Sequence, residues 1–282
     1  WSDSLANVGM ITDAEWADLD NNGTKELILA GEFMPITVFE NVAGTLGEAT
    51  EKFGLDQHKG WWRKISLHDI NQDGLIDILA GNEGLNTKYD VSETEPIEIF
   101  AKDFDSNGRM DPIMSCYIEG ERHMLHSKST LETQVINFKR RYVKHEDFAK
   151  ANFDKILLPG LRMNAYTRSA NTFANMFFLN SSTGFEGKEL PIIAQVSPIY
   201  SINEHEGVYY LSGNDFSTEV VVGQYDAGRG VALKFENNKW HVVNSDYVIK
   251  GEVKNSVVVE SLGKKMIIHG VLNEKLKTYS FD

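Results

Sequence analysis

One acidic phrase that contains a glycine occurs three times in the first 111 residues of the chain. The copies read "DLDNNGTKE", "DINQDGLID" and "DFDSNGRMD". Each places oxygen-bearing side chains at positions 1, 3, 5 and 9 and glycine at position 6. A phrase that recurs in one frame indicates a repeating fold unit more than a single local turn. The residues concerned are Asp18, Asp20, Asn22, Gly23 and Glu26; Asp69, Asn71, Asp73, Gly74 and Asp77; and Asp103, Asp105, Asn107, Gly108 and Asp111.

This spacing is typical of a calcium-binding loop. Alternate residues of a tight loop direct their oxygens to one point, and glycine at position 6 permits the sharp backbone turn. The carbonyl at position 7, from Thr24, Leu75 or Arg109, can turn inward as a further ligand. We therefore expect about three Ca²⁺ sites. For a single copy, the alternative is a solvated turn, since Asp, Asn and Gly are common turn residues.

The loops differ from an EF-hand in a way that predicts their setting. An EF-hand has a bidentate Glu at position 12 and flanking helices, whereas position 12 here is Leu29, Ala80 or Met114. The first two loops are followed by the apolar runs "ELILAG" and "DILAG", which are typical of strands. The sequence therefore predicts calcium loops between strands.

Strand patterns continue along the chain, as in "PITVFEN", "VYYLSG" and "GVALKFE". Short strands at fairly regular spacing, in a chain with 23 glycines and 6 prolines, indicate an all-β repeat fold. A unit of roughly four strands fits the blade of a β-propeller. We expect one propeller-type domain over residues 1–282, with about four to five blades.

The loop followed by "LILAG" or "ILAGN", with "VFEN" one strand later, resembles the FG-GAP/VCBS repeat. That resemblance implies a calcium-bearing β-propeller of the kind found in the integrin α-subunit head. The longer phrases "GNEGLNTKY", "IFAKDFDSNGRMDP" and "GQYDAGRGVAL" are similar to bacterial envelope proteins related to cartilage acidic protein. The resemblance implies an extracellular, outer-membrane-surface or periplasmic location, and a protein or glycan ligand.

Two departures from the repeat pattern carry further expectations. After "QVSPIYSI" the resemblance implies another calcium loop, but "NEHEG" does not rebuild the frame, so we expect a short hairpin without an ion. The first and second loops begin 51 residues apart, and the second and third begin 34 apart. The third loop is therefore expected between later strands of the second blade. Since the chain starts at Trp1, it is expected to be the C-terminal part of a larger propeller.

Residues 121–165 interrupt the strand pattern and predict a helical insert of two helices. Ser129 and Glu132 form a capping box at the start, and Pro159-Gly160 ends the second helix. The insert either binds a ligand or caps a sheet edge. Its basic run includes Arg140 and Arg141, which either contact an anionic ligand or form a solvated helix face.

Composition excludes some partners. A net charge of -13 argues against nucleic acid, which requires a basic surface. No stretch approaches the roughly 20 apolar residues of a membrane-spanning helix. The single cysteine, Cys116, cannot form a disulfide within the chain.

We find no catalytic motif, and so no candidate catalytic residue, and predict a non-catalytic binding module. Trp61 and Trp62 could stack on a sugar ring, although they are equally suited to a blade core. The alternative is a polysaccharide lyase or hydrolase on the same scaffold. A deep central pocket with an unpaired carboxylate or an Arg/Tyr cluster away from the loops would favour the enzyme.

Overall fold

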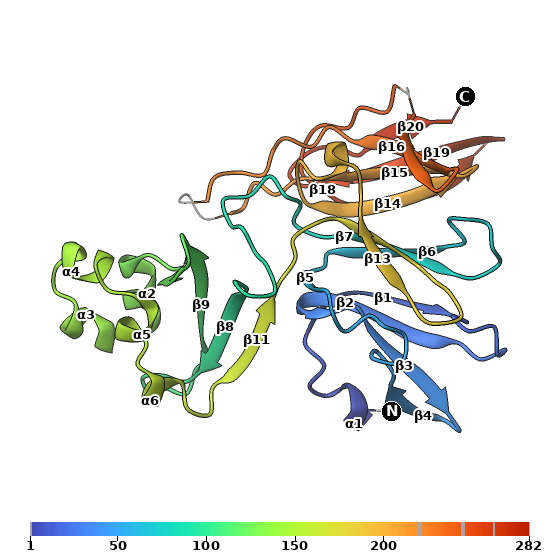
Figure 1. Ribbon diagram of the computed structural model, residues 1–282. Coiled ribbons are helices and arrows are strands. Elements are labelled where there is room, and N and C mark those ends of the chain that lie inside the picture. The colour runs from blue at the N-terminus through green and yellow to red at the C-terminus, as the bar shows by residue number, and fades with distance from the viewer. Residues whose placement is uncertain (1, 219–221, 244–245, 262, 282) are drawn as a thin grey trace. The chain divides into compact units, whose positions relative to one another are not determined.

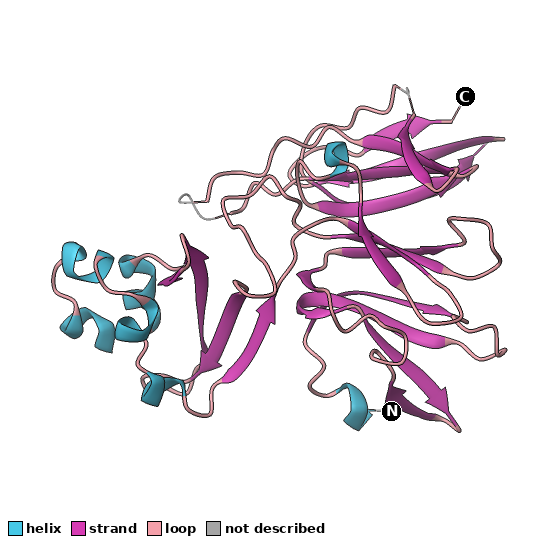
Figure 2. Ribbon diagram, viewed as in Figure 1, coloured by secondary structure: helices cyan, strands magenta, loops and turns pink. Residues whose placement is uncertain are grey.

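The computed structural model describes residues 2–218, 222–243, 246–261 and 263–281. Strands dominate these residues, and the helices are short (Figure 2). All strand pairs are antiparallel, and the all-β prediction is confirmed. The chain divides into two compact units: unit 1 comprises Trp1–Lys88 and Phe173–Asp282, and unit 2 comprises Tyr89–Thr172.

The first sheet of unit 1 is a meander, and the phrase "ELILAG" lies in its second strand. Side chains along a strand alternate between the two faces. Ile28 and Ala30 therefore face the second sheet, while Leu27 and Leu29 pack on the other side against Leu5 of the N-terminal segment. The elements are α1 (Ser2–Leu5), β1 (Met10–Ala17), β2 (Glu26–Pro35), β3 (Thr37–Val42), β4 (Thr45–Glu48) and β5 (Lys59–Trp61), which pairs with β2.

The second sheet is assembled from two distant parts of the chain. Its central strands are neighbours, with Ile78 opposite Phe178, although all of unit 2 lies between them in the sequence. Ile78 and Ala80 pack on the first sheet and Leu79 packs on the third, so the strand from "DILAG" is buried on both faces. The strands, in sheet order, are β13 (Glu186–Glu189), β12 (Met176–Leu179), β7 (Asp77–Gly81) and β6 (Lys64–His68).

The third sheet contains the altered phrase "NEHEG". Its first two strands are joined by the two-residue turn Glu206–Gly207, with φ angles of 51° and 75°. Positive φ at both positions suits a tight hairpin, and the short hairpin expected here is confirmed. The sheet comprises β14 (Ile199–His205), β15 (Val208–Gly213), β16 (Val231–Glu236) and β17 (Lys239–Val242), preceded by the 3₁₀-helix η1 (Ile192–Ala194).

The fourth sheet packs on the third, through Val253, Ile267 and Val271 against Tyr210 and Ala232. The four sheets of unit 1 follow one another face to face, and the strands that come first along the chain in successive sheets are neighbours (Figure 1). Such a succession of small antiparallel sheets is consistent with propeller blades. The fourth sheet comprises β18 (Val253–Ser261), β19 (Lys264–Val271) and β20 (Lys277–Ser280).

Unit 2 has a sheet of its own, and it contains the third acidic loop. The expectation that this loop lies between later strands of the second blade is wrong, because the strands on either side pair with each other in a separate sheet. Residues 121–124, assigned to the helical insert from the sequence, form a strand of this sheet. In sheet order the strands are β10 (Glu121–Met124), β9 (Asp111–Ile118), β8 (Ile97–Lys102) and β11 (Tyr166–Ala170).

The helical segment of unit 2 contains five short helices where two were expected. The first helix is capped by Ser127, whose side chain accepts from the Thr130 N–H, and not by Ser129. Pro159 begins the last helix instead of ending the one before, since a proline at the first helical position lacks only an N–H that would be unpaired anyway. The helices are α2 (Lys128–Gln134), α3 (Asn137–Arg141), α4 (His145–Ala149), α5 (Phe153–Ile156) and α6 (Pro159–Arg162).

Candidate metal centres

Each acidic loop joins two adjacent antiparallel strands: β1 to β2, β6 to β7, and β8 to β9. In all three, the carboxylate at position 1 accepts the N–H groups of positions 5 and 6. The distances are 3.0 and 2.8 Å at Asp18, 3.0 and 2.9 Å at Asp69, and 3.0 and 2.8 Å at Asp103. The first acid of each loop therefore holds the backbone in the same tight turn.

The backbone conformation of the loops also repeats. Positions 4 and 6 both have positive φ, a region that glycine enters without steric cost and other residues enter rarely. The larger angles occur at position 6, so the glycine there adopts the turn at the lower steric cost. The angles are 57°, 62° and 62° at Asn21, Gln72 and Ser106, and 86°, 90° and 84° at Gly23, Gly74 and Gly108.

The acid at position 9 is the first residue of the following strand and is buried in every loop: Glu26, Asp77 and Asp111. Each accepts a hydrogen bond from the N–H of position 2, and this bond holds the two ends of the loop together. These distances are 2.8 Å from Leu19, 2.8 Å from Ile70 and 2.9 Å from Phe104.

The first and third loops each bring three carboxylates together. One oxygen each from Asp18, Asp20 and Glu26 lie within 4.8 Å of one another, and so do those of Asp103, Asp105 and Asp111. The described residues include no such group in the second loop. There, Asp73 accepts from the Asn71 side-chain amide at 2.8 Å and from the Leu75 N–H at 2.9 Å.

Two buried oxygens in these clusters have no hydrogen-bond partner, Oε1 of Glu26 and Oδ1 of Asp105. Burial raises the pKa of the Glu26 carboxyl, the N–H of Leu19 lowers it, and the nearby Asp20 and Asp18 raise it further. A buried carboxylate oxygen without a donor is costly. A cation at this position would supply the missing partner, and carboxylate and amide oxygens are the ligands that Ca²⁺ prefers.

The first two loops contact each other, a feature that the sequence analysis missed. Asn21 donates to the Gly74 carbonyl at 3.2 Å. The buried Asn180, which directly follows β12, donates to the carbonyls of Leu19 at 2.7 Å and Ile76 at 3.2 Å. Asn180 also donates its backbone N–H to Asp77 at 2.8 Å. The only sequence signal was an asparagine at the end of the apolar run "MFFLN".

The two tryptophans proposed as ligand contacts lie in different settings. Trp62 has 0% exposure, in the core between the first and second sheets, so the expectation that it contacts a ligand is wrong. Trp61 is half-buried, and its ring lies 5.2 Å from that of Phe33 and 4.7 Å from that of Phe173.

The two arginines of the basic run also differ. Arg140 is exposed. Arg141 donates to the carbonyls of Lys155 and Ile156, at 2.6 and 3.2 Å, and so satisfies acceptors at the end of α5. The sequence could not distinguish them, because the acceptors of Arg141 belong to another helix.

An Arg/Tyr cluster lies away from the loops in unit 1. The Arg63 guanidinium donates to Glu32 and Glu83 and lies 5.5 Å from the centre of the Tyr200 ring. The Tyr200 hydroxyl donates to Asp215 at 3.0 Å, and burial raises its pKa. Each of these charged groups thus has a partner within the cluster, which suits a structural role.

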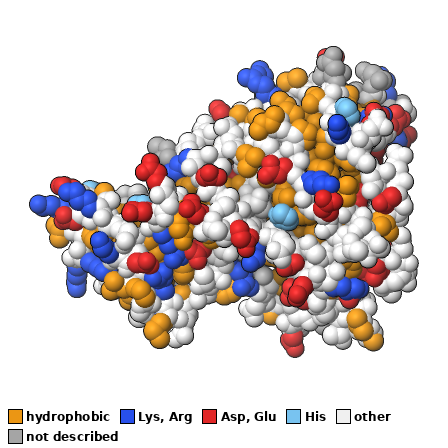
Figure 3. Space-filling model, viewed as in Figure 1, with side chains coloured by type: hydrophobic (Ala, Val, Ile, Leu, Met, Phe, Trp, Pro, Cys, Tyr) orange, Lys and Arg blue, Asp and Glu red, His pale blue; other side chains and the backbone are white. Residues whose placement is uncertain are grey.

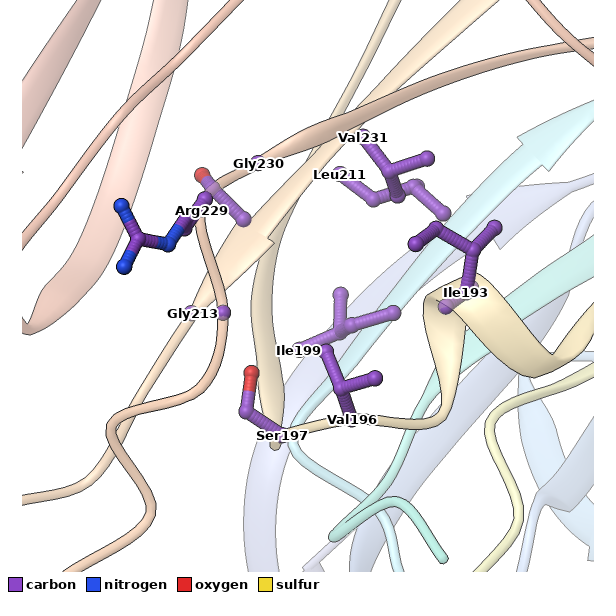
Figure 4. A pocket seen from close by; sticks show the side chains of 12 residues that line it. Ile193, Val196, Ser197, Ile199, Leu211, Gly213, Arg229, Gly230 and Val231 are labelled. Atoms are coloured by element: carbon purple, nitrogen blue, oxygen red, sulfur yellow. The ribbon is translucent and has the colours of Figure 1, made fainter. Parts of the chain in front are cut away.

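Two cavities of unit 1 differ greatly in size. The one in Figure 4 has a volume of about 20 Å³, and the side chains of Ile193, Leu211 and Val231 lie close together around it. That volume is close to the minimum for one water molecule. The other, of about 460 Å³, lies beside the second loop and the β14–β15 turn, with Asp69, Glu204 and Tyr209 in its wall. Its volume is in the range of small-molecule sites.

Comparison with known proteins bears on the first part of the chain. None of the described helices is long and apolar enough to cross a membrane. No curated protein matches the sequence. Residues 6–80 match the family model of the FG-GAP-like repeat. The chain therefore carries an FG-GAP-like repeat, which spans the first sheet, β6, all but the last residue of β7, and the first two acidic loops.

Proposed function

We propose that the acidic loops bind Ca²⁺. The observation that carries this proposal is the pair of buried, unpartnered oxygens, on Glu26 and Asp105, in the two clusters of three carboxylates. The side chains at positions 1, 3, 5 and 9 would hold the ion, with the carbonyls of Thr24, Leu75 and Arg109 as further ligands. In the second loop, Asp73 would first have to release the Asn71 amide.

The role of the ion would be structural. Each loop begins at the end of one strand, and its last acid is the first residue of the next. Each loop carries three carboxylates, whose repulsion the ion would remove. The hydrogen bonds of Asn21 and Asn180 connect the first two loops, so an ion that stabilises one of these loops would also stabilise its contact with the neighbouring sheet.

We further propose that the protein is a non-catalytic binding module for a protein or glycan outside the cytoplasm, in the periplasm, on the outer-membrane surface or outside the cell. The FG-GAP-like repeat supports this by association only, since one fold serves many functions. The 460 Å³ cavity is of ligand size. The Arg63–Tyr200 cluster gives the enzyme alternative no support, because its charges pair with one another.

The substitution Glu26→Gln tests the calcium proposal, because it removes one charge from the first cluster and keeps the side-chain shape. We expect isothermal titration of the chelator-treated protein with Ca²⁺ to show one site fewer than in the wild type. Glu48→Gln, an exposed position on β4 of the same sheet, is the matched control and should leave the titration unchanged. If Glu26→Gln and the wild type bind the same number of ions, the assignment of the first site is wrong.

A further inference from the structure

Five of the exposed large apolar side chains of unit 2 lie at residue 110 and within residues 158–166, whereas the exposed Ile118, Ile136 and Val143 lie elsewhere in the sequence. We name this group the apolar rim. Exposed apolar residues that occur singly are normal, whereas a contiguous group marks a surface for interaction. The members are Met110, Leu158, Leu161, Met163 and Tyr166, with exposed fractions of 65%, 43%, 39%, 66% and 45%.

The strand register places both segments at one end of the unit 2 sheet. Lys102, the last residue of β8, pairs with Asp111, so Met110 lies directly beyond that pair. The preceding residue of β8, Ala101, pairs with Tyr166 at the start of β11. The Lys102 ammonium also donates to the carbonyls of Leu161 and Met163, at 3.3 and 2.8 Å. The third acidic loop, which follows Lys102, is therefore adjacent to the apolar rim.

Basic side chains accompany the apolar rim. Residues 102–111 and 154–168 carry five Lys or Arg side chains and four carboxylates, a balance of +1 in a chain whose net charge is -13. Arg162 is paired with Asp154, and Lys102 donates to backbone carbonyls. Of the other three cations, Arg109 and Lys155 are exposed and Arg168 is half-buried. The Arg168 guanidinium lies 4.6 Å from the centre of the Tyr166 ring, which places a cation beside an exposed aromatic side chain. Figure 3 shows hydrophobic side chains together where Figure 1 places α6, with Lys and Arg side chains over the helices beside them.

We propose that the apolar rim docks on the surface of an anionic phospholipid bilayer. Apolar side chains on loops and a single helical turn can enter the boundary between headgroups and acyl chains without a matching partner shape. The side chains of Arg109, Lys155 and Arg168 would meet the phosphates, since each cation near an anionic membrane adds attraction. The apolar stems of long side chains and the Tyr166 ring suit this interface.

Calcium would strengthen this docking, an extension that rests on the proposed function of the third loop. One Ca²⁺ there would raise the local balance from +1 to +3. The carboxylates of Asp103, Asp105 and Asp111, which lie next to the apolar rim, would then repel lipid phosphates less, because the ion offsets two of their three charges. Docking is therefore expected to be weaker when Ca²⁺ is removed.

The test is co-sedimentation of the whole protein with vesicles of phosphatidylcholine alone and of phosphatidylcholine with 30% phosphatidylglycerol, each with Ca²⁺ or with EGTA. We expect binding to the anionic vesicles with Ca²⁺, and at least tenfold weaker binding to the neutral vesicles. The double variant Leu161→Ser/Met163→Ser should lose at least tenfold in partitioning, as expected for two apolar side chains removed from an interface. The matched control, Ile192→Ser/Ile193→Ser, changes two exposed apolar side chains of unit 1 and should bind as the wild type does.

The outcomes separate this inference from the calcium proposal, because Ca²⁺ binding is measured independently by titration. Ca²⁺ binding without sedimentation on anionic vesicles would overturn the docking proposal and leave the calcium proposal standing. Sedimentation that is the same in EGTA would support the docking surface and overturn its link to calcium. Equal losses of vesicle binding in the two double variants would also overturn the docking proposal. So would a protein that does not bind vesicles but self-associates in a way that only Leu161→Ser/Met163→Ser abolishes. Thermal unfolding of each variant checks that it is folded.

Discussion

At the scale of single residues, Asn180 connects two acidic loops that begin 51 residues apart in the chain. Its side-chain amide donates to carbonyls in both loops from a buried position, and its N–H holds the acid at position 9 of the second loop. The position of this asparagine depends on β12, which enters the second sheet only after unit 2. A residue outside the repeated phrase therefore stabilises two copies of it.

Asn180→Ala should lower the free energy of unfolding by about 3 kcal/mol, because it removes the donor to the buried carbonyl of Leu19 and to the half-buried carbonyl of Ile76, and unsatisfied buried groups cost about 1–3 kcal/mol each. Urea denaturation in the presence of EGTA measures this without a contribution from metal. Asn137→Ala, at an exposed position of α3, is the control and should change stability by less than about 0.5 kcal/mol. Equal effects of the two substitutions would contradict the bridging role.

His269 should make unit 1 sensitive to acid. The side chain is buried on β19, and burial lowers its pKa from 6.5 to about 4. The His269 side chain of the unfolded protein therefore binds a proton at a higher pH than that of the folded protein does. As a result, the contribution of neutral His269 to the free energy of unfolding is complete above about pH 6.5 and is lost as the pH falls towards 4. The loss should reach about 2–3 kcal/mol, at 1.36 kcal/mol per pKa unit.

Urea denaturation in EGTA at pH 7.0, 5.5 and 4.5 measures this dependence. His269→Leu should be less sensitive to pH over that range, whereas His241→Leu, at an exposed position on β17, should follow the wild type. If His269→Leu loses stability with acid as steeply as the wild type, another group is responsible.

At the scale of elements, the acidic loops are held by their own backbones. Gly74 has a φ angle of +90°, and a methyl group added there would meet no atom within 4 Å. A substitution at this glycine therefore tests conformation alone. Gly47, on β4, has equally open surroundings without a positive φ, so it provides a matched control.

Gly74→Ala should destabilise the protein by about 1–2 kcal/mol, the cost of placing a residue with a Cβ in the left-handed region. Gly47→Ala should leave stability unchanged or raise it by about 0.5 kcal/mol, because alanine restricts the unfolded chain. Both values come from urea denaturation in EGTA. A cost at Gly47 equal to that at Gly74 would show that φ is not the cause.

At the scale of the whole molecule, the proposed ions should stabilise some hairpins and leave others unaffected. The β14–β15 hairpin has a two-residue turn in place of an acidic loop, and its sheet is otherwise similar to the others of unit 1. It therefore provides a comparison within the same protein. Loss of calcium should affect only the hairpins that contain the phrase.

Chelation with EGTA should lower the melting temperature by several degrees, because a ligand that binds only the folded state stabilises it. Hydrogen exchange followed by mass spectrometry should show faster exchange in residues 18–26, 69–77 and 103–111. Peptides from β14 and β15 should exchange at the same rate with and without Ca²⁺. An unchanged melting curve, or a uniform increase in exchange across all sheets, would contradict the proposed sites.

Much of the local structure could be predicted from the sequence. The strands after the first two loops, the strand setting of all three loops and the short hairpin at "NEHEG" all follow from interactions within a few residues. In each loop, an acid bonds to N–H groups four and five residues later, and a glycine supplies the necessary φ. The helical segment was less predictable, because its five helices have only 4 to 7 residues each and are determined by caps and packing.

The amino-acid sequence by itself determined the hairpins, the conformation of the acidic loops and the alternation of apolar side chains, because these depend on near neighbours and on the two faces of a strand. Only the tertiary structure decided that β7 pairs with β12 across unit 2, that Trp62 is core, and that the third loop belongs to a separate sheet. These features depend on which distant segments meet. Several arrangements bury similar apolar area, and only long-range packing selects one of them.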